Sequence, residues 1–104
     1  MAYRVEITAR AERDLNVLHG QIRAADSEQA RQWYFGLSTA IYGLREMPGR
    51  CSRTPENKKL GHLLYGRKPY VYHVIFRTRV KTRFVEILHI RYGARRKFRA
   101  PDLE

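Results

Sequence analysis

Residues 69–91, PYVYHVIFRTRVKTRFVEILHIR, contain two runs in which side chains of opposite character alternate. In the first run, residues 69–78, Tyr72, Val74 and Phe76 alternate with His73 and Ile75. In the second, residues 82–91, the even positions from 84 to 90 alternate with the odd positions from 85 to 91. A period of two is typical of β-strands. The segment therefore predicts a β-hairpin with its turn at residues 78–81.

Two further strands and a first helix are predicted before this hairpin. Residues 3–8, YRVEIT, and residues 63–68, LLYGRK, read as short strands. Apolar residues at positions 11, 15, 18 and 22 follow the spacing of one helical face. They predict an amphipathic helix from residue 9 to about residue 25, and residues 50–62 read as a loop.

A second helix is expected to begin at Asp26, whose side chain is placed to cap the amide of Gln29. Its apolar stripe runs from residue 30 to Met47, and the Pro-Gly pair at 48–49 ends it. Gly36 and Gly43 lower its helix propensity. We expect a close approach by the first helix to explain them.

The order strand, helix, helix, strand, strand, strand predicts an α+β domain. We expect an N-terminal strand, an antiparallel helix hairpin and a three-stranded antiparallel meander. Together the strands form one mostly antiparallel sheet with both helices on one face. The 104 residues fit a single domain, 1–104, with a basic C-terminal tail at about residues 93–104.

Composition excludes several classes of protein. No apolar run has the length of a signal peptide or of a transmembrane helix, so we expect a cytoplasmic protein with no membrane partner. The single cysteine, Cys51, excludes an intrachain disulfide and a cysteine-cluster metal site. The sequence has no P-loop, dinucleotide fingerprint or nucleophile elbow. We therefore expect no metal and no cofactor.

The net charge of +11 belongs entirely to the second half of the chain. Residues 1–48 carry six basic and six acidic residues, whereas residues 49–104 carry fifteen basic and four acidic ones. Such asymmetry indicates a polyanionic or acidic partner for that half. Nucleic acid, the ribosome or an acidic protein would each fit, and the alternative is a generally basic protein with no such ligand.

The sheet face opposite the helices is the candidate site, because it is otherwise left to solvent. Cations interleaved with aromatic rings suit single-stranded nucleic acid, with charges for phosphates and rings for bases. The residues expected to bind a nucleic acid or another target are Arg53, Lys58, Lys59, Arg67, Lys68, Tyr72, Tyr92, Arg96, Lys97 and Phe98.

RNA cleavage by the same face would need an acid, a base and cations around the developing charge. His62, His73 or His89 could supply the proton transfer, and arginines the stabilisation. A histidine on an alternating strand is more often a structural, hydrogen-bonded residue than a catalyst. Both interpretations of His73 and His89 remain open at this point, and His62 reads as an exposed loop residue.

The ordered set YRVEIT–ARAERDL, LREMPGRC, LLYGRKPYVYHVIF and ILHIRYGARR resembles the RelE/ParE toxin superfamily of type II toxin–antitoxin modules, and is most similar to its ParE-like branch. The resemblance spans residues 3 to about 96. It implies an α+β toxin whose cognate antitoxin wraps around it in a hetero-oligomer.

Two activities follow from this resemblance. ParE-like members poison DNA gyrase, which is the target we favour. They act without the catalytic residues of RelE-like members. RelE-like members cleave mRNA on the ribosome. In that alternative His73 falls where those enzymes keep an arginine, Arg91 and Arg95 are counterparts of a second arginine, and Phe98 is the ring nearest to their terminal tyrosine. A third alternative is a non-toxic module that binds RNA or protein.

Overall fold

A computed structural model of the protein describes residues 2–51, 53–54, 59–67 and 71–92. Strand β1 (Arg4–Ile7) is followed by two helices, α1 (Ala9–Gln21) and α2 (Glu28–Tyr42). Two 3-10 turns come next, η1 (Gly43–Arg45) and η2 (Pro48–Arg50). The chain then forms three strands, β2 (Gly61–Tyr65), β3 (Tyr72–Arg79) and β4 (Phe84–Tyr92). The sheet order is β1-β4-β3-β2, with β1 parallel to β4 and the other pairs antiparallel. The α+β class and the mostly antiparallel sheet are thus confirmed.

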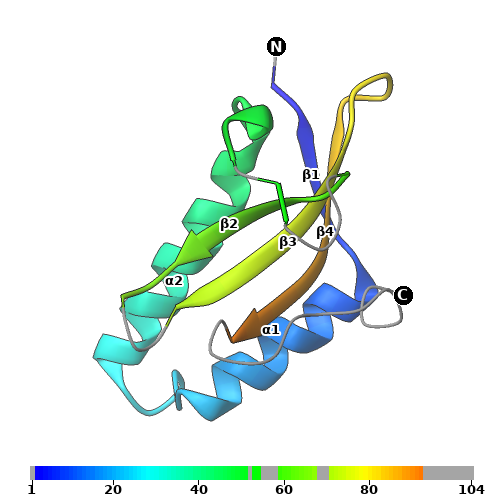
Figure 1. Ribbon diagram of the computed structural model, residues 1–104. Helices are drawn as coiled ribbons and strands as arrows, with labels where there is room; N and C mark the ends of the chain where they lie inside the picture. Colours follow the sequence, from blue (N-terminus) through cyan, green and yellow to red (C-terminus); the bar gives the residue numbers. More distant parts are fainter. Residues whose placement is uncertain (1, 52, 55–58, 68–70, 93–104) are drawn as a thin grey trace.

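Both helices lie on the same face of the sheet and diverge from one another, with α1 beside β4 and α2 behind β2 (Figure 1). This helix-covered face holds the main core, which consists of apolar residues from both helices, from η1 and from β3 and β4. Its buried members are Ala11, Leu15, Leu18, Leu37, Ile41, Leu44, Val74, Phe76, Val85, Ile87 and Ile90. No helix in the described ranges is long and apolar enough to cross a membrane.

Thr8 joins the first strand to the first helix. Its hydroxyl accepts a hydrogen bond from the Ala11 amide at 3.3 Å, which caps α1. The same hydroxyl donates to the Ile87 carbonyl at 2.7 Å. One side chain therefore sets both the start of α1 and its position against β4.

The turn between the helices differs in detail from the expectation. Helix α1 ends at Gln21, earlier than predicted, because Arg23 adopts a left-handed conformation (φ 59°). The Arg23 amide then bonds the Gly20 carbonyl and the Ala24 amide bonds the His19 carbonyl, closing a Schellman motif. The N-cap of α2 is Ser27, which accepts from the Ala30 amide, so the predicted cap at Asp26 is one residue too early.

Helix α2 also ends before the predicted position. It stops at Tyr42 and tightens into η1, so Met47 does not extend the buried stripe and is 73% exposed. Gly36 faces strand β2 rather than the first helix, since a Cβ there would lie 2.2 Å from the Tyr65 hydroxyl. A Cβ at Gly43 would meet nothing within 4 Å. The predicted approach of α1 to these glycines is wrong.

The predicted hairpin is present, with its turn at residues 80–83 rather than 78–81. Within it, β4 carries one residue more than β3, because Phe76 pairs with Ile87 but Ile75 pairs with His89. Leu88 is the extra residue of a β-bulge. The bulge reverses the alternation of β4 beyond this point, so Ile87 and Ile90 both enter the main core. The uninterrupted alternation predicted for residues 84–91 is therefore wrong.

Candidate functional site

The sheet face opposite the helices, called the open face below, carries a small apolar cluster. Leu60, Ile75 and Leu88 are buried together, separate from the main core. Leu60 is held there because its carbonyl accepts from the Thr54 amide at 2.9 Å, and Thr54 is itself buried. The segment before β2 thus covers part of the open face, while Leu64 of β2 remains 55% exposed.

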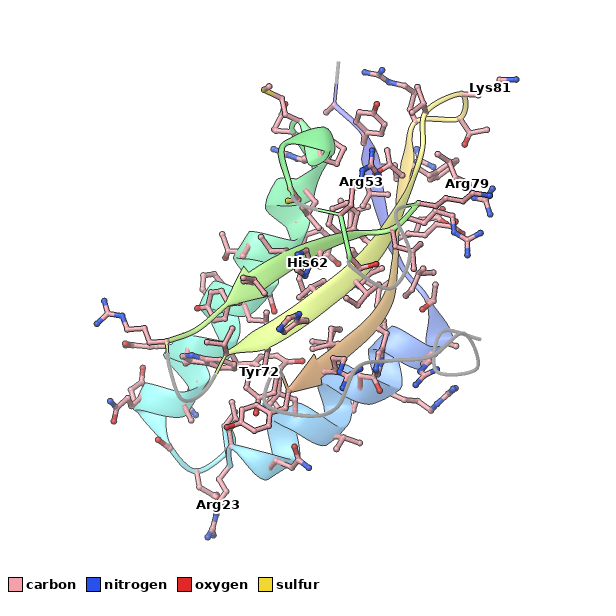
Figure 2. The ribbon with its side chains drawn as sticks, in the orientation of Figure 1. Arg23, Arg53, His62, Tyr72, Arg79 and Lys81 are labelled. Carbon is pink, nitrogen blue, oxygen red and sulfur yellow. The ribbon has the colours of Figure 1, made fainter. Side chains whose placement is uncertain are left out.

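Two histidines meet beside this cluster. His62 of β2 and His73 of β3 are diagonal neighbours, since His62 pairs with Ile75 and Leu64 pairs with His73. Their Nδ1 atoms are 3.4 Å apart, and their ring centroids are 5.4 Å apart. Both rings are half-buried. Figure 2 shows His62 over the middle of the sheet. The sequence does not reveal this pair, because the two residues stand 11 positions apart and His62 reads as a loop residue.

Arg91 lies next to this pair, directly opposite His73 in the register of β3 and β4. The register therefore places Arg91 on the same face as the two imidazoles, and Arg91 also lines a groove between α1 and the ends of β3 and β4. Such groups can transfer protons and stabilise a phosphate charge. Arg95, the other arginine of the predicted catalytic set, lies outside the described residues.

His89 has a different environment from His73. Its Nδ1 is 2.7 Å from the Asp14 carboxylate of α1, which also accepts the Ile90 amide at 3.1 Å. Burial raises the pKa of Asp14, but the hydrogen bonds from His89 and Ile90 and the nearby charges outweigh it and lower the pKa below 3.8. This contact fastens α1 to β4 beyond the end of β1, which favours the structural interpretation of His89.

Tyr72 and Tyr92 lie on the helix-covered face. Tyr72 packs against the main core, with its ring centroid 5.5 Å from that of Trp33. Tyr92 pairs with Tyr72, and the two ring centroids are 5.4 Å apart. Both tyrosines line a groove of ≈ 730 Å³ between α1 and the ends of β3 and β4, with Arg10 and Gln21 on its α1 side. They are therefore separated by the sheet from His62 and His73.

The predicted binding cations are dispersed. Arg53, Lys59 and Arg67 are exposed, and Arg53 forms an isolated bridge with Gly61 at the start of β2. The remaining predicted binding residues, Lys58, Lys68, Arg96, Lys97 and Phe98, lie outside the described residues, as does the rest of the tail at 93–104.

Sequence reasoning missed a group of cations at the tip of the β3–β4 hairpin. Arg79 and Lys81 lie at this end of the molecule, and Arg53 lies toward it (Figure 2). Arg77 and Arg79 are both exposed, and both contact Glu86 of β4, with Nε–Oε1 distances of 3.9 Å and 2.6 Å. The sequence pattern that could have revealed these cations is the alternation of Arg77 and Arg79 along β3, because every second residue of a strand faces the same side of the sheet.

Three solved structures of toxin–antitoxin proteins share this fold. The fold resembles a chromosomal ParDE system from P. aeruginosa (TM-score 0.71, 18% identity, 88% of this chain and 96% of that chain covered). It also resembles a RelBE toxin–antitoxin complex from Mycobacterium tuberculosis (TM-score 0.62, 20% identity, 91% and 95% covered). A third similar structure is a mutant of the E. coli toxin RelE in the free state (TM-score 0.62, 13% identity, 89% and 85% covered).

The family itself follows from the sequence. Residues 5–97 match the model of the ParE toxin of the type II toxin–antitoxin system parDE. The chain belongs to this family. A sequence comparison with curated proteins gives no significant match.

Proposed function

We propose that this chain is the growth-inhibiting toxin of a type II toxin–antitoxin module, that DNA gyrase is its favoured target in the cytoplasm, and that a cognate antitoxin neutralises it. The observation that carries the proposal is the match of residues 5–97 to the ParE toxin model. The gyrase target is what resemblance to the ParE-like branch implies.

The positions of the rings support a target other than a single nucleic-acid strand. Stacking of bases needs aromatic faces beside the cations. Tyr72 and Tyr92 instead pack on the helix-covered face. In the described part of the open face, the two imidazoles lie beside aliphatic Leu60, Ile75 and Leu88. The ring of Phe84 lies nearer the hairpin end, opposite Arg79, with Arg4 Cζ 5.8 Å from its centroid. The part of the open face around the histidines fits a protein target better than a stacked strand.

Induction without antitoxin tests the proposal. Growth arrest, gyrase-dependent DNA breaks and cleavage of mRNA on ribosomes would be scored for the wild type and for His73→Ala. We expect breaks and arrest in both, because the gyrase activity does not use the imidazole. Ribosomal cleavage that disappears in His73→Ala would contradict the gyrase target, and absence of arrest would favour a non-toxic binding module.

A RelE-like ribonuclease is the second candidate, and the cluster of His62, His73 and Arg91 favours it. One imidazole would take the proton of the 2′-hydroxyl and an acid would protonate the leaving oxygen, with Arg91 stabilising the phosphate. However, the two Nδ1 atoms are only 3.4 Å apart, which leaves no room for a phosphate between them. The pair would serve as one proton-transfer group, and the other role would fall to another residue.

Antitoxin binding is proposed to be partly electrostatic. With a net charge of +11, we expect carboxylates of the antitoxin near Arg53, Arg67 or Arg95. Arg53→Glu and Arg67→Glu should weaken the complex, most strongly at low salt. Arg23→Gln is the matched control, because Arg23 is exposed at the distant turn between the helices (Figure 2). Affinity that is insensitive to salt in all variants would contradict the electrostatic contribution.

A further inference from the structure

The His62–His73 pair has the geometry of two ligands of one metal ion. Two nitrogens that each lie about 2.0–2.1 Å from a tetrahedral zinc ion are roughly 3.3–3.4 Å apart. The observed Nδ1–Nδ1 distance is 3.4 Å. In the absence of an ion, the same distance is a long hydrogen bond between the two rings, with one Nδ1 as donor and the other as acceptor. The separation therefore suits shared coordination, with the ion in place of the bridging proton.

The two paired strands hold the two histidines in place, and both imidazoles remain partly accessible to solvent. His62 and His73 are anchored on adjacent, hydrogen-bonded strands, so their spacing is set by the sheet rather than by loops. Ile75, the register partner of His62, is fully buried in the cluster with Leu60 and Leu88. Both imidazoles are half-buried, and Leu64 beside them is 55% exposed. An ion could thus enter from solvent without disturbing the core.

We propose that His62 and His73 form a two-histidine site for a transition-metal ion of the zinc class, bound through both Nδ1 atoms. Imidazole nitrogen suits Zn²⁺, Ni²⁺ and Cu²⁺. Among the residues that the structure describes, no group of three His, Cys, Asp or Glu side chains is placed to hold a metal. The described residues therefore supply two nitrogen ligands, and we assign water to the remaining coordination positions.

The site departs from the expectation of no metal, and it does not rest on the toxin assignment. It has a structural consequence, since the ion would link β2, one of the two edge strands, to β3. An ion that binds the folded chain stabilises it by mass action. At a free concentration of a hundred times Kd, the ratio of folded to unfolded protein rises about a hundredfold, less any binding to the unfolded chain.

The test uses the full chain without an affinity tag. Thermal unfolding would be followed at increasing ZnCl2 for the wild type, His62→Gln and His73→Gln. His19→Gln is the matched control, because it removes an imidazole of α1 that contacts Tyr34 and not the pair. We expect zinc to raise the unfolding midpoint of the wild type and of His19→Gln, and to lose this effect in the other two variants. An equal rise in all four, or no rise in the wild type, would overturn the proposal.

A second measurement needs no variant and covers the case in which a histidine variant fails to fold. Co²⁺ would be titrated into the wild-type chain and the visible absorption of tetrahedral cobalt recorded at neutral pH and at about pH 5. Because only neutral imidazole binds a metal, the absorption should appear at neutral pH and be lost in acid. An octahedral spectrum of aqueous cobalt at both values would also overturn the proposal.

Discussion

The two faces of the sheet differ in what their residues do. The helix-covered face buries apolar side chains from both helices and from β3 and β4, as in Leu37, Phe76 and Ile87. The described part of the open face buries the smaller cluster of Leu60, Ile75 and Leu88 and places ionisable groups beside it. Stability and chemistry therefore reside mainly on opposite sides of the same strands, and substitutions on each side should separate them.

The largest expected effect is on the helix-covered face. Phe76 is 1% exposed in the main core, so Phe76→Ala should lower the free energy of unfolding by about 3–5 kcal/mol through lost burial and the cavity left behind. Leu64→Ala on the open face is the matched control, and should change it by less than about 0.5 kcal/mol. Urea unfolding followed by circular dichroism measures both. Similar losses in the two variants would remove the distinction between the faces.

A glycine pair tests how closely the helix-covered face is packed. A Cβ at Gly61 would lie 2.6 Å from the Phe76 ring, so Gly61→Ala should destabilise the protein by about 1–3 kcal/mol. A Cβ at Gly20 in α1 would meet nothing within 4 Å. Gly20→Ala should instead stabilise it by up to about 1 kcal/mol, because alanine favours the helix. Equal midpoints for the two variants in thermal unfolding would contradict the close contact.

Asp14 joins α1 to the end of β4 through His89 and Ile90, and its effect depends on pH. Its pKa is lowered from the usual value in the folded chain, so its contribution is present above the unfolded pKa and is lost as pH falls through the folded pKa. Asp14→Asn should lower the free energy of unfolding near neutral pH by about 1 kcal/mol, a value that solvent screening reduces. The difference from wild type should shrink below about pH 4. A difference that stays constant down to about pH 2 would contradict the ionic role.

The smallest expected effect is at Glu86 on the open face. Its pairs with Arg77 and Arg79 are exposed to solvent, so Glu86→Gln should change the free energy of unfolding by less than about 0.5 kcal/mol. It should nevertheless strengthen binding of a model polyanion such as heparin, since two arginines lose their carboxylate partner. Elution from a heparin column at rising salt measures this, and unchanged elution would show that the hairpin end does not bind anions.

Much of the fold could be predicted because local periodicity and packing agree. The stripe of Leu15 and Leu18 and the alternation of Val74 and Phe76 both point to the face that is buried. The predicted helix ends were less accurate than the predicted faces. Asp26 and Ser27 are both good N-cap residues, and the turn that contains the left-handed Arg23 leads to Ser27 as the cap of α2. Such backbone choices leave little trace in composition.

The candidate site was harder to predict, for two physical reasons. The contact between His62 and His73 depends on the strand register, which the loop before β2 does not reveal. The face of the sheet on which Tyr72 and Tyr92 lie depends on helix packing and on the bulge at Leu88. No turn residue in the sequence indicates that bulge. His73 and Arg91 could be named from residue type, but their shared face could only be seen in the fold.

The bulge at Leu88 also acts as a selector of which chemistry reaches the open face. If the intact β4 paired residue by residue with no bulge, Ile90 would stand opposite His73, and Arg91 would stand opposite Tyr72. An aliphatic side chain would then lie beside the imidazoles, and the guanidinium would lie on the helix-covered face. The one extra residue of β4 thus decides whether a charged or an aliphatic side chain ends the open face.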